Sequence, residues 1–143
     1  MTDTILVPVD GSDYSRQALA VAATEFTTDK HIVLYVIDPF DLNSTAEKSV
    51  WTQEFMEQQE REAEKLLNEY EELAADLDIS IQTELKYGSP ARAIIGAADD
   101  FNADHIVIGS KGRSEIDRVL LGSVAETVVK RAFTSVTIVR PDQ

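Results

Sequence analysis

Residues 31–37 read HIVLYVI, and this stretch decides the fold. Every residue after the histidine is apolar, and four of those six are β-branched. A continuous apolar run of this length favours a strand that is covered on both faces, as the strands of a parallel sheet are. Four further runs predict strands at residues 4–9 (TILVPV), 79–85 (ISIQTEL), 105–108 (HIVI) and 135–139 (SVTIV).

Stretches with helical periodicity separate these strands. The longest predicted helix covers about residues 51–77, where apolar residues recur at the spacing of one helix face. This apolar stripe consists of Phe55, Ala63, Leu66, Tyr70, Leu73 and Leu77. Shorter helices are predicted at about residues 15–27, from a cap at Ser89 to Phe101, and at about residues 123–132.

Two of these helices carry start signals. Pro90 follows Ser89, and proline is favoured at the first helical position because its missing N–H would have no intrahelical acceptor. Ser123 is followed three residues later by Glu126, the spacing of a capping box. We therefore expect Ser123 to be the N-cap of the last helix.

The alternation of strand and helix predicts an α/β fold. Its form would be an open doubly wound parallel five-stranded sheet, Rossmann-like, in a single domain over residues 1–143. Ligands of such sheets bind outside the carboxyl ends of the strands. The residues that follow Val9, Ile37, Leu85 and Ile108 are therefore the places to search.

Composition excludes several classes of protein. The 143 residues carry 13 Lys and Arg against 26 Asp and Glu, a formal net charge of −13, and no cysteine. The absence of cysteine excludes disulfides, thiolate metal sites and cysteine nucleophiles. The negative charge disfavours nucleic acids and anionic membranes as partners. Because the N-terminal region has no basic segment followed by a long apolar run, we expect a cytoplasmic protein without a membrane span.

Glycines gather where the fourth strand meets the last helix. Gly109 and Gly112 follow the strand, and Gly122 precedes Ser123. Glycines permit close approach of a ligand, and the N–H groups at a helix start attract anions. Residues 109–131 hold five basic and three acidic side chains, a net charge of +2 in an acidic chain. A phosphate chain is the expected ligand, although Gly109 and Gly112 alone are typical of a plain loop, and Gly122-Ser123 alone is equally typical of a helix cap.

Asp10 lies directly after the first strand. A carboxylate at this place is able to accept hydrogen bonds from both hydroxyls of a ribose. An equally good interpretation is a turn residue, because Asp10-Gly11-Ser12 is a turn-forming sequence.

Other nucleotide and hydrolase signatures are absent. The chain contains neither G-x-x-x-x-G-K-[ST] nor G-x-G-x-x-G, and the residues around Ser110 do not fit G-x-S-x-G. Its two histidines, His31 and His105, fall at predicted strand starts, opposite the ligand edge. A catalytic triad or a zinc site built on histidine is therefore not expected.

The spacing glycine, two residues, glycine, nine residues, glycine, serine resembles the nucleotide-binding signature of the ATP-binding branch of the universal stress proteins. The resemblance covers nearly the whole chain. It is carried by ILVPVDGSDYSRQAL (5–19), LYVID (34–38), YGSPARAII (87–95), IVIGSKGRS (106–114), LLGSVAETVVKRA (120–132) and VTIVRP (136–141).

The resemblance implies a set of site residues. Asp10 would hold the ribose, Pro8 and Val9 would line the adenine pocket, and Val36 would meet the adenine edge through its backbone. The phosphates would be wrapped by Gly109, Gly112, Arg113, Gly122, Ser123 and Val124. The implied cofactor is ATP, with any Mg²⁺ held by phosphates and water rather than by a protein metal site.

Two function classes remain open. The first, which we favour, is a binding module that senses adenine nucleotides in the stress response and is not an enzyme. The second is a slow ATP hydrolase or phosphotransferase, for which Asp10, Glu115 and Asp117 are the acids near the glycines.

The last strand suggests self-association. Residues 135–139 would lie at an edge of the sheet, and an unpaired apolar edge favours pairing with a second copy. The resemblance implies the same homodimer, with Val136 and Ile138 at its interface.

Overall fold

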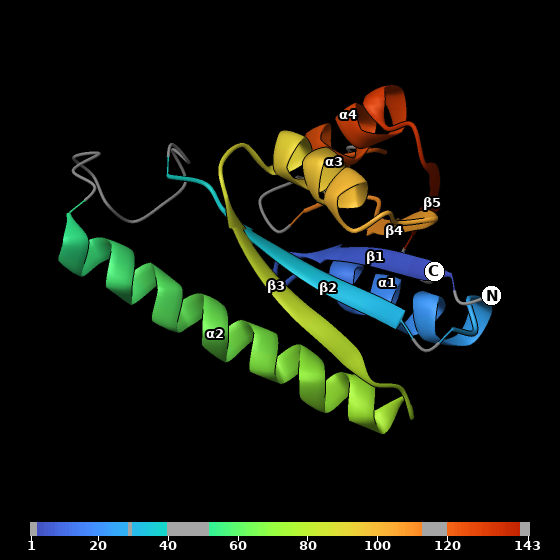
Figure 1. The fold of residues 1–143 in the computed structure, drawn as a ribbon, viewed down its shortest axis with the longest axis horizontal. Coiled ribbons are helices and arrows are strands. Elements are labelled where there is room, and N and C mark those ends of the chain that lie inside the picture. The colour runs from blue at the N-terminus through green and yellow to red at the C-terminus, as the bar shows by residue number, and fades with distance from the viewer. Residues whose placement is uncertain (1–2, 29, 40–51, 113–119, 141–143) are drawn as a thin grey trace.

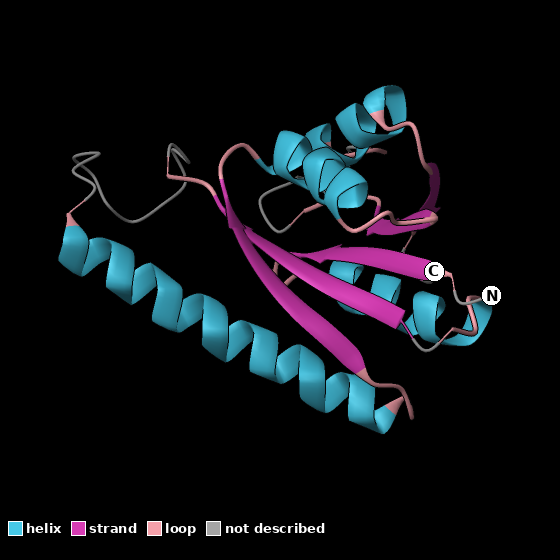
Figure 2. Cartoon of the chain, viewed as in Figure 1, coloured by secondary structure: helices cyan, strands magenta, loops and turns pink. Residues whose placement is uncertain are grey.

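The computed structural model describes residues 3–28, 30–39, 52–112 and 120–140. Strands and helices alternate from one end of the chain to the other (Figures 1 and 2). Their order is β1 (Thr4–Val9), α1 (Asp13–Glu25), β2 (Lys30–Ile37), α2 (Gln53–Asp76), β3 (Ile81–Tyr87), α3 (Pro90–Asp100), β4 (His105–Gly109), α4 (Ser123–Arg131) and β5 (Ser135–Val139).

The five strands form one parallel sheet in the order β3-β2-β1-β4-β5. The predicted doubly wound α/β architecture is therefore confirmed. β1 lies at the centre, and β3 and β5 form the edges. The chain first builds outward on one side of β1 and then crosses to the other side after β3.

Helices cover both faces of the sheet, as the apolar strands require. On one face, Val7, Val33 and Val107 pack against residues of α1 and α2. On the opposite face, Leu6, Ile32 and Ile106 pack against α3 and α4. Alternate residues of each strand thus enter two separate cores, which explains why the central strands contain almost no polar residue.

The boundaries of several elements differ from the sequence prediction by one or a few residues. α1 begins earlier than predicted because Ser12 caps it, its hydroxyl accepting from the Ser15 N–H at 3.2 Å. β3 begins at Ile81 rather than at residue 79, because the Ile79 N–H still donates to the Ala74 carbonyl of the helix end. The Ser123 capping box is wrong: Gly122 is the N-cap of α4 and Ser123 is its first residue.

Both histidines lie at strand starts, as predicted. His31 is buried, and its Nε2 lies 3.2 Å from the Ala22 carbonyl and 3.1 Å from that of Phe26. His105 packs its ring against Phe26 and bonds the Thr137 hydroxyl at 2.6 Å. Both side chains therefore contact helix α1 or strand β5 at the amino edge. Across the described ranges, no helix has the length and apolar character needed to cross a membrane.

Candidate functional site

The order of the strands creates a topological switch point between β1 and β4. After β1 the chain adds β2 and β3 on one side of it, and after β3 the chain crosses to add β4 and β5 on the other side. In open α/β sheets this is the place where ligands bind, at the carboxyl ends of the two strands. In this chain those ends lead into Asp10 and into Ser110.

Pro8 limits the pairing of these two strands. The ladder between β1 and β2 runs from Thr4 to Val9, whereas the ladder between β1 and β4 covers only Ile5 and Leu6. Because the Thr4 carbonyl accepts from Asp104 beside β4, the polar groups of every second residue of β1 face β4. Pro8 belongs to this series and has no N–H to donate. The sheet therefore stops pairing at the switch point before either strand ends.

Asp10 is held in a turn by one of its two carboxylate oxygens. Its Oδ1 accepts from the Ser12 N–H at 2.9 Å and from the Ser15 hydroxyl at 3.2 Å. Gly11 has a φ of +87°, a conformation that favours glycine. The turn interpretation of Asp10 is thus correct.

Gly112 brings Asp10 together with the second glycine segment. A Cβ placed on Gly112 would lie 2.9 Å from Asp10 Oδ2. The two residues are far apart in sequence, and only the adjacency of β1 and β4 makes them neighbours. The glycine at 112 therefore leaves room for Oδ2 of Asp10.

Gly109 allows close packing between α1 and β4, and its predicted role beside the phosphates stays a prediction. A Cβ on Gly109 would lie 2.8 to 2.9 Å from the Cβ and backbone of Tyr14, so the missing side chain lets α1 approach β4. Lys111 lies close by, with its Nζ 5.7 Å from the centre of the Tyr14 ring. A cation is thus present at the switch point, whereas Gly109 serves the packing of the helix.

The start of α4 lies against the same segment. The Gly122 N–H donates to the Ser110 carbonyl at 2.7 Å, and the Ser110 N–H donates to the Val139 carbonyl at 2.8 Å. These two amides are therefore paired within the protein, and the role of Gly122 beside the phosphates stays a prediction. As a glycine N-cap, Gly122 offers no side-chain cap to α4. Ser123, which is exposed, and Val124, which is half-buried, form the first turn of α4.

Val36 and Val9 lie on opposite faces of the sheet. Val9 belongs to the core beneath α1 and α2, and Val36 packs on the core beneath α3 and α4. The Ile37 carbonyl accepts from Gly88 on the β3 side, so the polar groups of Val36 face the β1 side. Since β1 ends its ladder opposite Tyr35, these groups face the space beyond β1.

Some expected residues lie outside the described part of the chain. Arg113, Glu115 and Asp117 are among them. Within the described ranges, no group of three or more histidine or acidic side chains is placed to hold a metal ion.

Two residues of this site were not identified from the sequence as part of it. Ser15 bonds Asp10, and Tyr70 of α2 bonds both Ser15 and the Gly11 N–H. Burial raises the pKa of Tyr70, partly offset by these hydrogen bonds, so its hydroxyl stays protonated. Helical spacing identified Tyr70 only as a core residue, because its polar partner is 55 residues away in sequence.

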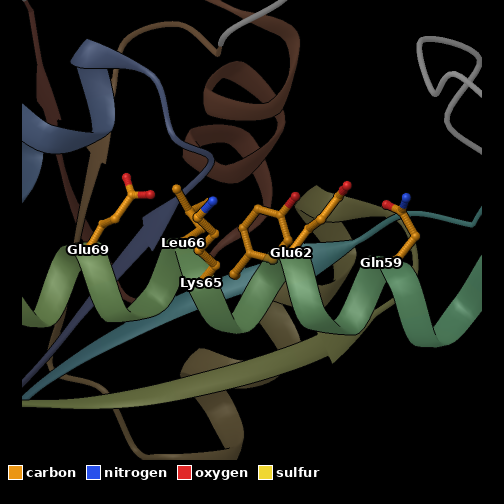
Figure 3. A pocket seen from close by; sticks show the side chains of 6 residues that line it. Gln59, Glu62, Lys65, Leu66 and Glu69 are labelled. Atoms are coloured by element: carbon orange, nitrogen blue, oxygen red, sulfur yellow. The ribbon is translucent and has the colours of Figure 1, made fainter.

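A separate pocket of about 270 Å³ lies between α2 and β2. It is lined by Tyr35 of β2 and by Gln59, Glu62, Lys65, Leu66 and Glu69 of α2 (Figure 3). Its two glutamates outweigh its one lysine, so the lining is acidic and unsuited to a polyphosphate.

Fold and site together define a class: a doubly wound α/β domain in which a carboxylate and a helix start meet at the switch point. Residues 1–140 match the universal stress protein family, and the chain belongs to that family. It is 34% identical over 139 residues to universal stress protein MJ0531 of Methanocaldococcus jannaschii, an alignment that covers 95% of this chain and 81% of that relative.

Solved structures share the fold. The structure of the protein MJ0577 has a TM-score of 0.82 and 30% identity, covering 100% of this chain and 99% of that one. A universal stress protein in complex with cAMP has a TM-score of 0.67 and 28% identity, covering 96% of this chain and 97% of its own.

Proposed function

We propose that this protein binds an adenine nucleotide, ATP, at the switch point and acts in the cytoplasm as a regulatory binding module of the stress response. The observation that carries the proposal is the meeting of Asp10 and the start of α4 across the segment from Ser110 to Gly112. A carboxylate suits the ribose hydroxyls, and a helix start suits phosphate. The cAMP complex of a similar family member supports an adenine nucleotide as the class of ligand.

The parts of the nucleotide would bind to different elements. The ribose would meet Asp10 Oδ2, and the adenine would pair with the backbone of Val36 while contacting Pro8 and Val9. The phosphates would lie near Gly112, with the first-turn amides of Ser123 and Val124 as donors and with Lys111 and Arg113 as cations. Mg²⁺ would be bound by the phosphates and by water.

We propose binding without turnover. Hydrolysis requires a group that orients and activates water. In the described part of the chain, the acid at the switch point is Asp10, whose Oδ1 is engaged by Ser12 and Ser15. Steady release of phosphate from Mg·ATP, lost when Glu115 or Asp117 is changed to alanine, would contradict this part of the proposal.

Calorimetric titration with ATP tests the proposal. A few charge-assisted hydrogen bonds, offset by ordering costs, predict a Kd of about 1 μM, or about −8 kcal/mol. The Gly112→Ala variant would push its methyl group against Asp10 Oδ2, and we expect its affinity to fall at least about tenfold, or 1.4 kcal/mol.

Gly96→Ala is the matched control. Gly96 lies in α3, and a Cβ there meets nothing within 4 Å. Its ATP affinity should equal that of the wild type. Equal affinities for all three proteins would refute the location of the site, and the absence of any saturable binding would refute the function.

A further inference from the structure

We infer that Tyr70 and Ser15 are positioning residues that orient Asp10 toward the ribose, an inference that rests on the proposed function. They are joined by hydrogen bonds that link three elements: the turn after β1, the first turn of α1 and the middle of α2. Tyr70 is 2% exposed, so this arrangement lies beneath the site rather than in it.

The number of protons fixes the direction of the hydrogen bonds. An ionised carboxylate and a carbonyl only accept, so the Ser15 hydroxyl has one proton for two acceptors, Asp10 Oδ1 at 3.2 Å and the Ser12 carbonyl at 3.1 Å. In the 2.6 Å contact between Ser15 and Tyr70, the donor must then be the Tyr70 hydroxyl. The Gly11 N–H in turn donates to the Tyr70 oxygen at 3.2 Å. The series therefore ends on the two acceptors of Ser15.

This series selects which oxygen of Asp10 faces the ligand. With Oδ1 accepting from Ser15 and Ser12, the carboxylate is turned so that Oδ2 lies on the Gly112 side. Without the Tyr70 hydroxyl, Ser15 Oγ loses the donor that holds it in place beside its two acceptors, Asp10 Oδ1 and the Ser12 carbonyl. Of the two donors to Oδ1, the Ser12 N–H would remain and the Ser15 hydroxyl would be weakened, so the carboxylate would be less firmly held in its position beside the ribose.

Helix α2 supplies a second contact to the same turn. Leu66, one helical turn before Tyr70, lies where a Cβ of Gly11 would approach its Cδ1 to 3.4 Å. Both residues face the turn, so α2 holds the Asp10 loop by packing and by a hydroxyl. Only the Tyr70 hydroxyl acts on the orientation of the Asp10 carboxylate. Mutation therefore separates this hydrogen bond from the packing of Leu66.

The test compares two ligands in calorimetric titrations of the full chain. ATP carries both ribose hydroxyls, and 2′,3′-dideoxy-ATP carries neither. For Tyr70→Phe and Ser15→Ala, we expect the Kd for ATP to rise about fivefold to tenfold, as the loss of one ordered hydrogen bond predicts. The Kd for the dideoxy ligand should change by less than about twofold. A merely structural role would weaken both ligands equally.

Tyr87→Phe is the matched control, because the Tyr87 hydroxyl also bonds α2, at Glu60, and strand β2 separates its strand β3 from β1. Both of its Kd values should equal those of the wild type. If wild type prefers ATP to the dideoxy ligand and Tyr70→Phe keeps that preference, the inference is overturned and the proposed function stands. If wild type binds neither ligand, the proposed function itself fails.

Should Tyr70→Phe fold poorly, Ser15→Ala keeps the inference testable. In addition, exchange of the Gly11 amide with solvent reports directly on the hydroxyl, because Tyr70 is its acceptor. Faster exchange at Gly11 is expected in Tyr70→Phe and not in Tyr87→Phe. Unchanged exchange would contradict the proposed series of hydrogen bonds.

Discussion

At the residue scale, glycines near the switch point differ in what they do. Gly11 adopts a positive φ, Gly109 lets a helix approach, and Gly112 makes room for a carboxylate oxygen. The sequence alone indicates that small residues are needed at these places. It does not indicate which neighbour requires them, since Tyr14 and Asp10 come close only in the folded chain.

A glycine-to-alanine substitution should therefore have opposite effects on stability at Gly109 and at Gly96. Gly109→Ala places a methyl group 2.8 to 2.9 Å from Tyr14 atoms, including its backbone, and we expect a loss of about 1–3 kcal/mol in the free energy of unfolding. Gly96→Ala, in the exposed middle of α3, should gain about 0.5–1 kcal/mol. Urea unfolding measures both. A stability of Gly109→Ala equal to wild type would contradict the packing role.

His105 makes stability depend on pH. Burial lowers its pKa below the ordinary value of 6.5, so the unfolded chain takes up a proton before the folded chain does. The stabilisation is complete above pH 6.5 and is lost as the pH falls from there through the folded pKa. His105→Gln, which cannot titrate, should lose less stability than wild type between pH 7 and pH 5. Equal losses in urea unfolding would contradict this assignment.

At the scale of elements, the strands and helices follow from sequence with shifts of about two residues at their ends. Burial of one or both faces sets the spacing of apolar residues in each element, and this spacing can be read from the sequence. The ends depend on single hydrogen bonds, such as the Ile79 amide that extends the turn after α2. Pro8 was predicted as part of a strand, and it is. Its missing N–H also limits the pairing of β1 with β4, which the sequence prediction did not include.

The edge strand β5 carries the prediction of a homodimer. Val136 and Ile138 are half-buried on the core beneath α3 and α4, whereas Phe133, just before the strand, is 96% exposed. Phe133→Ser changes no core residue, and we expect it to weaken a dimer formed through this edge. Ile138→Lys should give monomers, with circular dichroism as the check on folding. Light scattering that shows an unchanged dimer for both variants would contradict the interface.

At the scale of the whole molecule, charge distinguishes the pocket beside α2 from the switch point. The chain carries a net charge of −13, and the pocket beside α2 shares this acidic character. The switch point has Lys111 and the start of α4, both favourable to anions. The sequence alone showed that the segment after β4 is less acidic than the rest of the chain. That Asp10 lies beside this segment follows only from the strand order, which places β1 next to β4.

The location of the nucleotide is the central claim, and amide chemical shifts of the labelled protein during titration with ATP test it most directly. The predicted result is a saturable set of shifts at residues 10–12, 110–112 and 123–125, at the carboxyl ends of β1 and β4. Shifts confined to Tyr35, Glu62 and Glu69 around the α2 pocket, or no shifts at millimolar ATP, would contradict the account.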